Sequence, residues 1–264
     1  MTATDATKPY SERDISSTFA KGLKVLAAFD ETTRLLTMPD LAAATNLDRA
    51  SVRRLVVTLV HLGYLRKSGR HFSLTPKVLG LAGAYLRSNR IGAVVQPILN
   101  RFSAELGREI SVAAADGDAA IYVAQSSLRG AAVSFGFTVG SRLPGLHTAV
   151  GRMLLACADP DHARFLIETA EIRRHTRHSL LDRERIHAEV RQIAEQGHAF
   201  VREEFETGVS GLSVPVGPSF SASVVLGMSD MTERLRDPEI RTRSLALLQQ
   251  CGNEIDRTLV FAEG

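Results

Sequence analysis

The chain has 264 residues, of which 44% are hydrophobic and 23% charged. These values are typical of globular proteins, and they exclude a disordered chain, a collagen-like repeat or a coiled-coil rod as the main architecture. The longest uncharged stretch, 207–229, contains two prolines and four glycines, which excludes a membrane span there. Only two cysteines occur and no secretion signal precedes the first predicted helix, so we expect a cytoplasmic protein.

Charge divides the chain unevenly. Residues 1–90 carry 14 Lys and Arg against seven Asp and Glu, whereas the remaining residues carry 18 against 22. No acidic residue lies between Arg49 and Ala104, although this stretch contains ten Arg and Lys residues. A basic stretch of this kind indicates a polyanionic partner, but it is also compatible with an ordinary solvated face.

Three short helices are predicted in the first 63 residues. Apolar residues at helical spacing indicate a first helix from about 16 to about 29. Thr37 is placed to cap a second helix, with Asp40 three residues later as in a capping box. After a turn at 45–47, Asp48 caps a third helix over 49–62, which Gly63 ends. Two short helices joined by a tight turn are typical of a helix-turn-helix.

The third predicted helix has the composition of a DNA-recognition helix. Val52, Leu55, Val56 and Leu59 follow helical spacing and are predicted to face inward. The outward face of its first turns is then basic and small, which suits entry into the major groove and paired Arg contacts to guanine. The candidate DNA-binding residues on this helix are Arg49, Ala50, Ser51, Arg53 and Arg54.

A basic hairpin and an apolar helix follow. Residues 64–74 are predicted to form a hairpin with Arg66, Lys67 and Arg70 at its tip, which completes a winged helix-turn-helix that contacts DNA through its wing. From 76 to 88 the apolar residues recur at helical spacing and are too numerous for an isolated linker in water. We expect this helix to be buried in a dimer, which can read two half-sites of double-stranded operator DNA.

The remaining residues predict a mixed domain. Helices are predicted over 94–106, 148–158, 183–196 and 238–261, and strands over 110–115, 119–125, 132–135, 199–201, 212–216 and 223–229. Antiparallel strands with helices beside them indicate an α+β fold. The predicted organisation is a flexible tail over 1–16, a winged helix-turn-helix over 17–75, a linker and dimerisation helix over 76–90 and an effector-binding domain over 91–264.

The sequence resembles the IclR family of bacterial transcriptional regulators from Thr18 onward. The resemblance is carried by residues 19–23 (FAKGL), 41–47, 70–79 (RHFSLTPKVL), 139–144 (VGSRLP), 151–156 (GRMLLA), 208–209 and 213–215. The wing and linker, as far as Leu86, resemble the subgroup that controls the β-ketoadipate pathway of aromatic acid breakdown. The resemblance implies a GAF-like effector domain with a small-molecule pocket on one face of its sheet, and a homodimer or tetramer.

The resemblance also implies which residues form the effector pocket. One wall is the start of the helix at Thr148, Ala149 and Val150, whose free amides suit the carboxylate of an aromatic acid or a ring-cleavage product. His147, at the entry of this helix, either bonds the effector or only caps the turn. The implied opposite walls are Gly211, Ser213, Gly227 and Ser229, with Ala113 or Tyr122 on the hairpin side. Where many relatives have Cys or Ser, Gly211 is expected to leave the pocket roomier and without a polar contact.

Signals for other functions are weak. Residues 208–211 resemble a nucleophile elbow, but Leu212 stands where its second glycine belongs. His175 and His178 have a spacing seen in metal sites, but they lie among arginines, so we interpret them as a surface pair. Phe135 and Phe137 alternate as in a strand and are expected in the core. The sequence therefore predicts no catalytic residue, cofactor, metal or membrane contact. Its alternatives are a small-molecule enzyme or a protein-interaction module that contains a winged helix.

Overall fold

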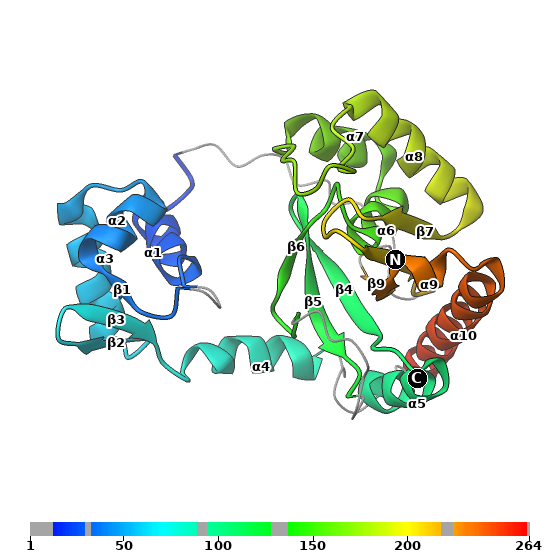
Figure 1. Cartoon of the computed structure of the whole chain (residues 1–264). Coiled ribbons are helices and arrows are strands. Elements are labelled where there is room, and N and C mark those ends of the chain that lie inside the picture. Colours follow the sequence, from blue (N-terminus) through cyan, green and yellow to red (C-terminus); the bar gives the residue numbers. More distant parts are fainter. Residues whose placement is uncertain (1–12, 30–32, 89–93, 128–136, 218–223, 263–264) are drawn as a thin grey trace. The chain divides into compact units, whose positions relative to one another are not determined.

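The computed structural model in Figure 1 describes residues 13–29, 33–88, 94–127, 137–217 and 224–262. Contacts divide the chain into two units, residues 1–85 and 86–264, so the division falls inside the predicted linker.

The first unit is a winged helix-turn-helix. Its elements are α1 (Ser17–Ala27), β1 (Leu36–Thr37), α2 (Met38–Thr45), α3 (Arg49–His61), β2 (Leu65–Ser68) and β3 (His71–Leu74). The wing hairpin pairs as predicted, and β1 adds a third strand beside β3. Sequence reasoning missed β1 because a strand of two residues has no periodicity to detect.

Capping side chains fix where α2 and α3 begin. Thr37 and Asp40 form the predicted capping box, in which the Thr37 amide donates to Asp40 Oδ2 at 2.8 Å. The Ser51 amide donates to Asp48 Oδ1 at 2.8 Å at the start of α3. Hydrogen bonds to Thr37 and Ser51 hold the pKa values of Asp40 and Asp48 below their usual range. Between the helices Asn46 adopts the left-handed conformation with φ of 53° that the tight turn requires.

Removing the α3 cap is expected to weaken the first unit. Asp48→Ala takes away the acceptor of the Ser51 amide and a negative charge at a helix N-terminus, and should lower the free energy of unfolding by about 1 kcal/mol. Urea unfolding followed by circular dichroism measures the change. Asp48→Asn keeps an acceptor at the same place and is the matched control. Equal losses for both variants would show that the capping bond contributes nothing.

The core of the first unit gathers the inward faces of these helices. Val25, Leu41, Val52 and Val56 are fully buried, and Leu55 is half-buried against them. The next helix, α4 (Val78–Ser88), begins two residues later than predicted, because residues 75–77 form a turn in which Val78 N donates to Thr75 O. Within the unpartnered chain its Leu79, Leu81 and Tyr85 side chains are exposed.

The second unit is built on a six-stranded antiparallel sheet of order β6-β5-β4-β9-β8-β7. The strands are β4 (Ser111–Asp116), β5 (Ala119–Gln125), β6 (Arg142–Pro144), β7 (Ala199–Arg202), β8 (Val209–Pro215) and β9 (Val224–Met231). The predicted strand over 132–135 lies outside the described residues, and β6 takes the edge beside β5. The strand predicted from Leu212 begins at Val209 instead, since its first residues pair with β9.

Helices cover both faces of this sheet (Figure 1). α5 (Gln96–Leu106) and α10 (Pro238–Ala262) pack together on one face, and α6 (Ala149–Cys157) packs on the other with α8 (Arg183–Gln196) beyond it. Neighbouring residues of β4 therefore face different cores: Val112 and Ala114 face α5 and α10, and Ala113 faces α6. Two further helices, α7 (Pro160–Thr169) and α9 (Thr232–Leu235), were not predicted.

Among the residues that the structure describes, no helix combines the length of a bilayer-crossing segment with the hydropathy that such a segment needs.

Candidate functional site

The second unit contains a small cavity, of about 50 Å³, where the N-terminus of α6 meets the sheet. Seven of the ten predicted effector residues line it: Tyr122, His147, Thr148, Ala149, Val150, Gly211 and Ser229. The others in its lining are Phe137, Leu143, Val201, Glu203, Glu204, Phe205, Glu206, Val209, Leu212 and Met228. Sequence reasoning therefore missed one whole wall, the segment 203–206, which has no motif of its own.

Three predicted residues, Ala113, Ser213 and Gly227, share the α6 face of the sheet but lie outside the cavity. Ala113 is fully buried in the core under α6. Ser213 is also fully buried, and its hydroxyl donates to Leu226 O at 2.7 Å. Gly227 is covered by α6, since a Cβ added there would lie 2.3 Å from Val150 Cγ1. Strand alternation places these residues on the face of the sheet that α6 covers. Because α6 packs closely there, no cavity remains beside them.

The expectation about Gly211 is also corrected. A Cβ added at Gly211 would lie 3.0 Å from Ala149 Cβ, so the missing side chain lets α6 approach β8 and leaves no extra room. Gly151 has a similar role, because a Cβ there would lie 2.3 Å from Gly145 O. These glycines set how closely the start of α6 lies against the sheet and against residues 144–146.

The first turn of α6 presents free backbone donors. Thr148 caps the helix by accepting from Gly151 N at 3.2 Å, and its hydroxyl donates to Pro144 O at 2.8 Å. Within the described part of the chain, the amides of Ala149 and Val150 have no hydrogen-bond acceptor. Unpaired amides at a helix N-terminus favour an anionic or strongly accepting group.

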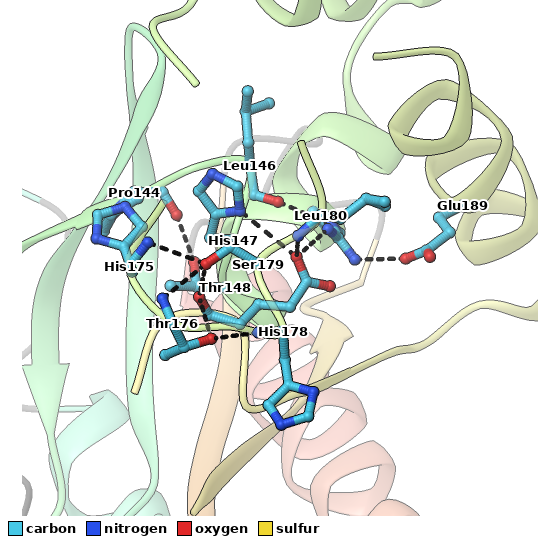
Figure 2. Close-up of polar contacts among 12 residues, drawn as sticks. Pro144, Leu146, His147, Thr148, His175, Thr176, His178, Ser179, Leu180 and Glu189 are labelled. Atoms are coloured by element: carbon cyan, nitrogen blue, oxygen red, sulfur yellow. Dashed lines mark hydrogen bonds and ion pairs between the residues drawn. The ribbon is translucent and has the colours of Figure 1, made fainter. Parts of the chain in front are cut away.

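His147 and Arg152 meet on one buried carboxylate, that of Glu204. Figure 2 shows His147, Leu146, Leu180 and Glu189, which all take part in this network. His147 Nδ1 lies 3.4 Å from Glu204 Oε2, Arg152 Nη2 donates to this oxygen at 2.7 Å, and the Leu180 amide donates to it at 2.9 Å. Arg152 is 1% exposed, donates through Nε to Leu146 O at 2.8 Å and also pairs with Glu189. The network joins α6, α8 and the segment 203–206 behind the cavity.

The ionisation of Glu204 follows from this network. Burial raises the pKa of Glu204, but the bonds from His147, Arg152 and the Leu180 amide outweigh burial and hold the pKa below its ordinary value of 4.5. Glu204 is therefore an ionised acceptor at neutral pH. No spacing in the sequence points to this contact, because Arg152 and Glu204 are 52 residues apart.

Glu204 should make the stability of this unit acid-sensitive. Because its folded pKa is lowered, the unfolded state binds more protons in acid, and the stability that Glu204 contributes is lost as the pH falls below about 4.5. The difference in unfolding free energy between the wild type and Glu204→Gln should shrink as the pH falls from about 6 to about 3. Denaturant unfolding at each pH measures this difference. Glu195→Gln, at an exposed site on α8, is the control and should show no such trend. A constant difference for Glu204→Gln would contradict this assignment.

Aromatic rings form a continuous row beside the cavity. Ring centroids are 6.4 Å apart for Tyr122 and Phe137, 6.0 Å for Phe137 and Phe205, 5.0 Å for Phe205 and His175, and 5.1 Å for His175 and His147. Burial raises the pKa of Tyr122 to about 12, so its hydroxyl stays protonated. Phe137 lies in no strand; it packs, partly buried, against the core under α6 and also lines the cavity, while Phe135 lies outside the described residues.

The discounted motifs have structural partners. Ser210, the serine of the elbow-like segment, is buried, and its Oγ lies 2.8 Å from Thr232 Oγ1, within hydrogen-bond distance. His178 Nε2 lies 3.7 Å from Glu203 Oε2, so a carboxylate does accompany this histidine, which the sequence did not indicate. Within the described ranges, no group of three or more His, Cys, Asp or Glu side chains is arranged to hold a metal ion.

The first unit exposes a basic face. Arg49, Ala50, Arg53 and Arg54 of α3 are exposed, and Ser51 is half-buried. On the wing, Arg66, Lys67 and Arg70 are exposed too. Among the described residues, no ion pair joins these side chains to a carboxylate, although Arg70 is close enough to Asp40 to help lower the pKa of that carboxyl. The face therefore keeps its positive charge, as a DNA-binding surface needs.

Known proteins resemble the chain over both units. The model of the IclR helix-turn-helix domain matches residues 18–69, and that of the bacterial transcriptional regulator IclR C-terminal domain matches residues 83–257. The Pca regulon regulatory protein of Pseudomonas putida is 35% identical over 92% of this chain and 84% of its own. The p-hydroxybenzoate hydroxylase transcriptional activator of Acinetobacter baylyi is 29% identical, with 96% of each chain covered.

Solved structures agree. A transcriptional regulator from Rhodococcus sp. RHA1 has a TM-score of 0.74 at 30% identity and covers 94% of this chain and 100% of its own. An IclR homologue from Microbacterium hydrocarbonoxydans, solved in complex with 4-hydroxybenzoate, has a TM-score of 0.75 at 20% identity, which shows the shared fold. The match covers 91% of this chain and 98% of the homologue. The predicted α+β fold and the predicted aromatic-acid subgroup are confirmed. The chain belongs to the IclR family of bacterial transcriptional regulators.

Proposed function

We propose that this chain, as a homodimer or tetramer in the cytoplasm, binds operator DNA and regulates genes of aromatic acid catabolism. In this proposal a small aromatic acid or ring-cleavage product binds in the cavity and changes the affinity for the operator, without any catalysis. The single observation that carries the proposal is the cavity at the start of α6, with two free amides and His147, in a chain 35% identical to a Pca regulon regulator.

DNA binding is assigned to α3 and the wing. Arg53 and Arg54 are exposed on the outward face of α3, two and three residues beyond Ser51 in its first turn, and nothing acidic in the described first unit neutralises them. We assign base contacts to this face and phosphate contacts to the wing residues Arg66, Lys67 and Arg70. The exposed apolar residues of α4 support the dimer, because paired winged helices read two half-sites.

The acid is assigned to the cavity, and its entry must change the surrounding structure. A cavity of about 50 Å³ is smaller than the roughly 150 Å³ that holds benzene. An aromatic acid can therefore enter only if side chains such as Phe137 and Phe205 move apart. This displacement supplies the difference between free and bound states that coupling to DNA affinity requires.

The proposal is tested by operator binding with and without ligand. Fluorescence anisotropy of a labelled operator fragment should show a change in Kd of about 5- to 150-fold when 4-hydroxybenzoate or a related aromatic acid saturates the protein. Isothermal titration establishes saturation. An acid that binds tightly and leaves the operator Kd unchanged would refute the coupling.

A wing variant should separate phosphate from base contacts. Lys67→Ala is expected to weaken binding to operator and random DNA alike and to reduce the slope of log K against log salt by about 1, because one phosphate contact is lost. Titrations at several salt concentrations measure the slope. Arg243→Ala, at an exposed site on α10, is the control for the loss of one positive charge. A loss confined to the operator would contradict the assignment of Lys67 to phosphate.

A further inference from the structure

His147 carries an unsatisfied atom at the wall of the cavity. Among the described residues, only two buried side-chain nitrogen or oxygen atoms lack a hydrogen bond, His147 Nε2 and Arg108 Nε. Arg108 Nε still lies 2.9 Å from a carboxylate oxygen of Asp230, whereas His147 Nε2 has no such neighbour. The His147 side chain is 2% exposed and lines the cavity. Buried polar atoms are rarely left unpaired, which points to a partner that arrives with a ligand.

The other ring nitrogen determines what this partner must be. His147 Nδ1 faces Glu204 Oε2, which already accepts from Arg152 and from the Leu180 amide. An ionised carboxylate only accepts, so the proton of a neutral His147 ring lies on Nδ1 and is directed at Glu204. Nε2 then presents a lone pair to the cavity. Its matching partner is a hydrogen-bond donor.

The charge around the cavity favours a neutral donor at this position. The ionisable lining residues are Tyr122, His147 and three glutamates, Glu203, Glu204 and Glu206, and no Lys or Arg belongs to the described lining. The basic group nearest to the network, Arg152, is already paired with Glu204 and Glu189. A carboxylate oxygen of the ligand would be repelled by the lone pair of Nε2, whereas a hydroxyl of the ligand can donate a hydrogen bond to that lone pair.

We propose that His147 Nε2 accepts a hydrogen bond from a hydroxyl group of the effector, so that the protein selects hydroxylated aromatic acids over acids without a hydroxyl. This inference rests on the proposed function, because it assigns a specificity residue to the same cavity. His147 recognises the hydroxyl, and Glu204 stabilises the tautomer of His147 that can accept this hydrogen bond.

The test compares matched ligands on the full-length protein. Isothermal titration measures Kd for 2-, 3- and 4-hydroxybenzoate and for the corresponding fluorobenzoates, in which fluorine replaces the hydroxyl without donating. The tightest-binding hydroxybenzoate should have a Kd about 10- to 100-fold lower than that of its fluoro analogue, since the analogue leaves Nε2 unpaired. Equal affinity of the two acids would overturn the inference and leave the proposed function standing. Absence of binding by all of these aromatic acids would overturn the inference and would leave a ring-cleavage product as the effector in the proposed function.

Variants locate the selectivity. His147→Asn keeps an amide that can donate toward Glu204 but places no atom at the position of Nε2, so the ratio should fall below about 3-fold. His162→Asn, at an exposed site on α7, is the control and should keep the wild-type ratio. An unchanged ratio in His147→Asn would overturn the assignment. In the wild-type protein, ¹⁵N NMR of the imidazole should show the Nδ1-protonated tautomer and a shift of Nε2 on adding the hydroxybenzoate. The opposite tautomer, or an unmoved Nε2, would also overturn it, whether or not the variant folds.

Discussion

Arg152→Met is expected to lower the free energy of unfolding of the effector-binding unit by about 3–5 kcal/mol. The side chain is 1% exposed, and its guanidinium bonds Glu204, Glu189 and the carbonyl of Leu146. Methionine fills a similar volume, but it leaves the Glu204 carboxylate buried without the positive charge of Arg152. It also leaves the Leu146 carbonyl without its donor. Chemical denaturation of the full-length protein, followed by the transition of this unit, measures the loss.

Two controls separate the buried network from a general effect of losing an arginine. Arg173→Met removes an exposed pair with Glu171 and should change the unfolding free energy by less than about 1 kcal/mol. The double variant Arg152→Met with Glu204→Gln removes both charges, so it should recover part of the loss. A small effect of Arg152→Met, or strictly additive losses in the double variant, would show that the ion pair does not hold this region together.

Arg53→Ala is expected to weaken binding to operator DNA by about 1–3 kcal/mol and to relax the preference for one base pair. Arg53 is exposed one turn into α3, beside the buried face that contains Val52 and Val56, where a paired contact to guanine is possible. Binding to random DNA should change much less. Anisotropy titrations against the operator, single-base variants and random sequence measure both effects.

The controls for Arg53 lie on the same protein. Arg243→Ala removes a charge far along the chain and should leave the operator Kd unchanged, and Lys67→Ala should affect all sequences alike. If Arg53→Ala weakened operator and random DNA by the same factor, Arg53 would be a phosphate contact and α3 would not be read as a recognition helix.

The local signals in the sequence were sufficient for the first unit. Thr37 with Asp40, and Asp48 with Ser51, are capping contacts between residues three apart, so the sequence alone places the starts of α2 and α3. The same holds for Gly107 and Gly197, which end α5 and α8 in the left-handed conformation. At these helix ends, where structure depends on neighbours along the chain, prediction and structure agree.

The site depends on contacts that local patterns do not encode. Asp159 followed by Pro160 was a start signal for α7 that was overlooked, but nothing local marks β6, which pairs three residues with β5. Glu204 and Arg152 meet only because α6 packs beside the segment 203–206. The resemblance points to the start of α6, which does line the cavity, whereas the depth of α6 on the sheet, which removes Gly227 and Ser213 from the cavity, required the structure.

In the proposed function, an aromatic acid controls where this protein binds DNA. Genomic fragments from the source organism, captured by the purified protein at near-physiological salt, should be few and should contain paired half-sites, since non-specific phosphate binding is weak there. Adding the tightest-binding hydroxybenzoate should change the recovery of those fragments, and the genes beside them should encode aromatic acid catabolism. Uniform recovery across the genome, or recovery that does not respond to a saturating acid, would contradict the account.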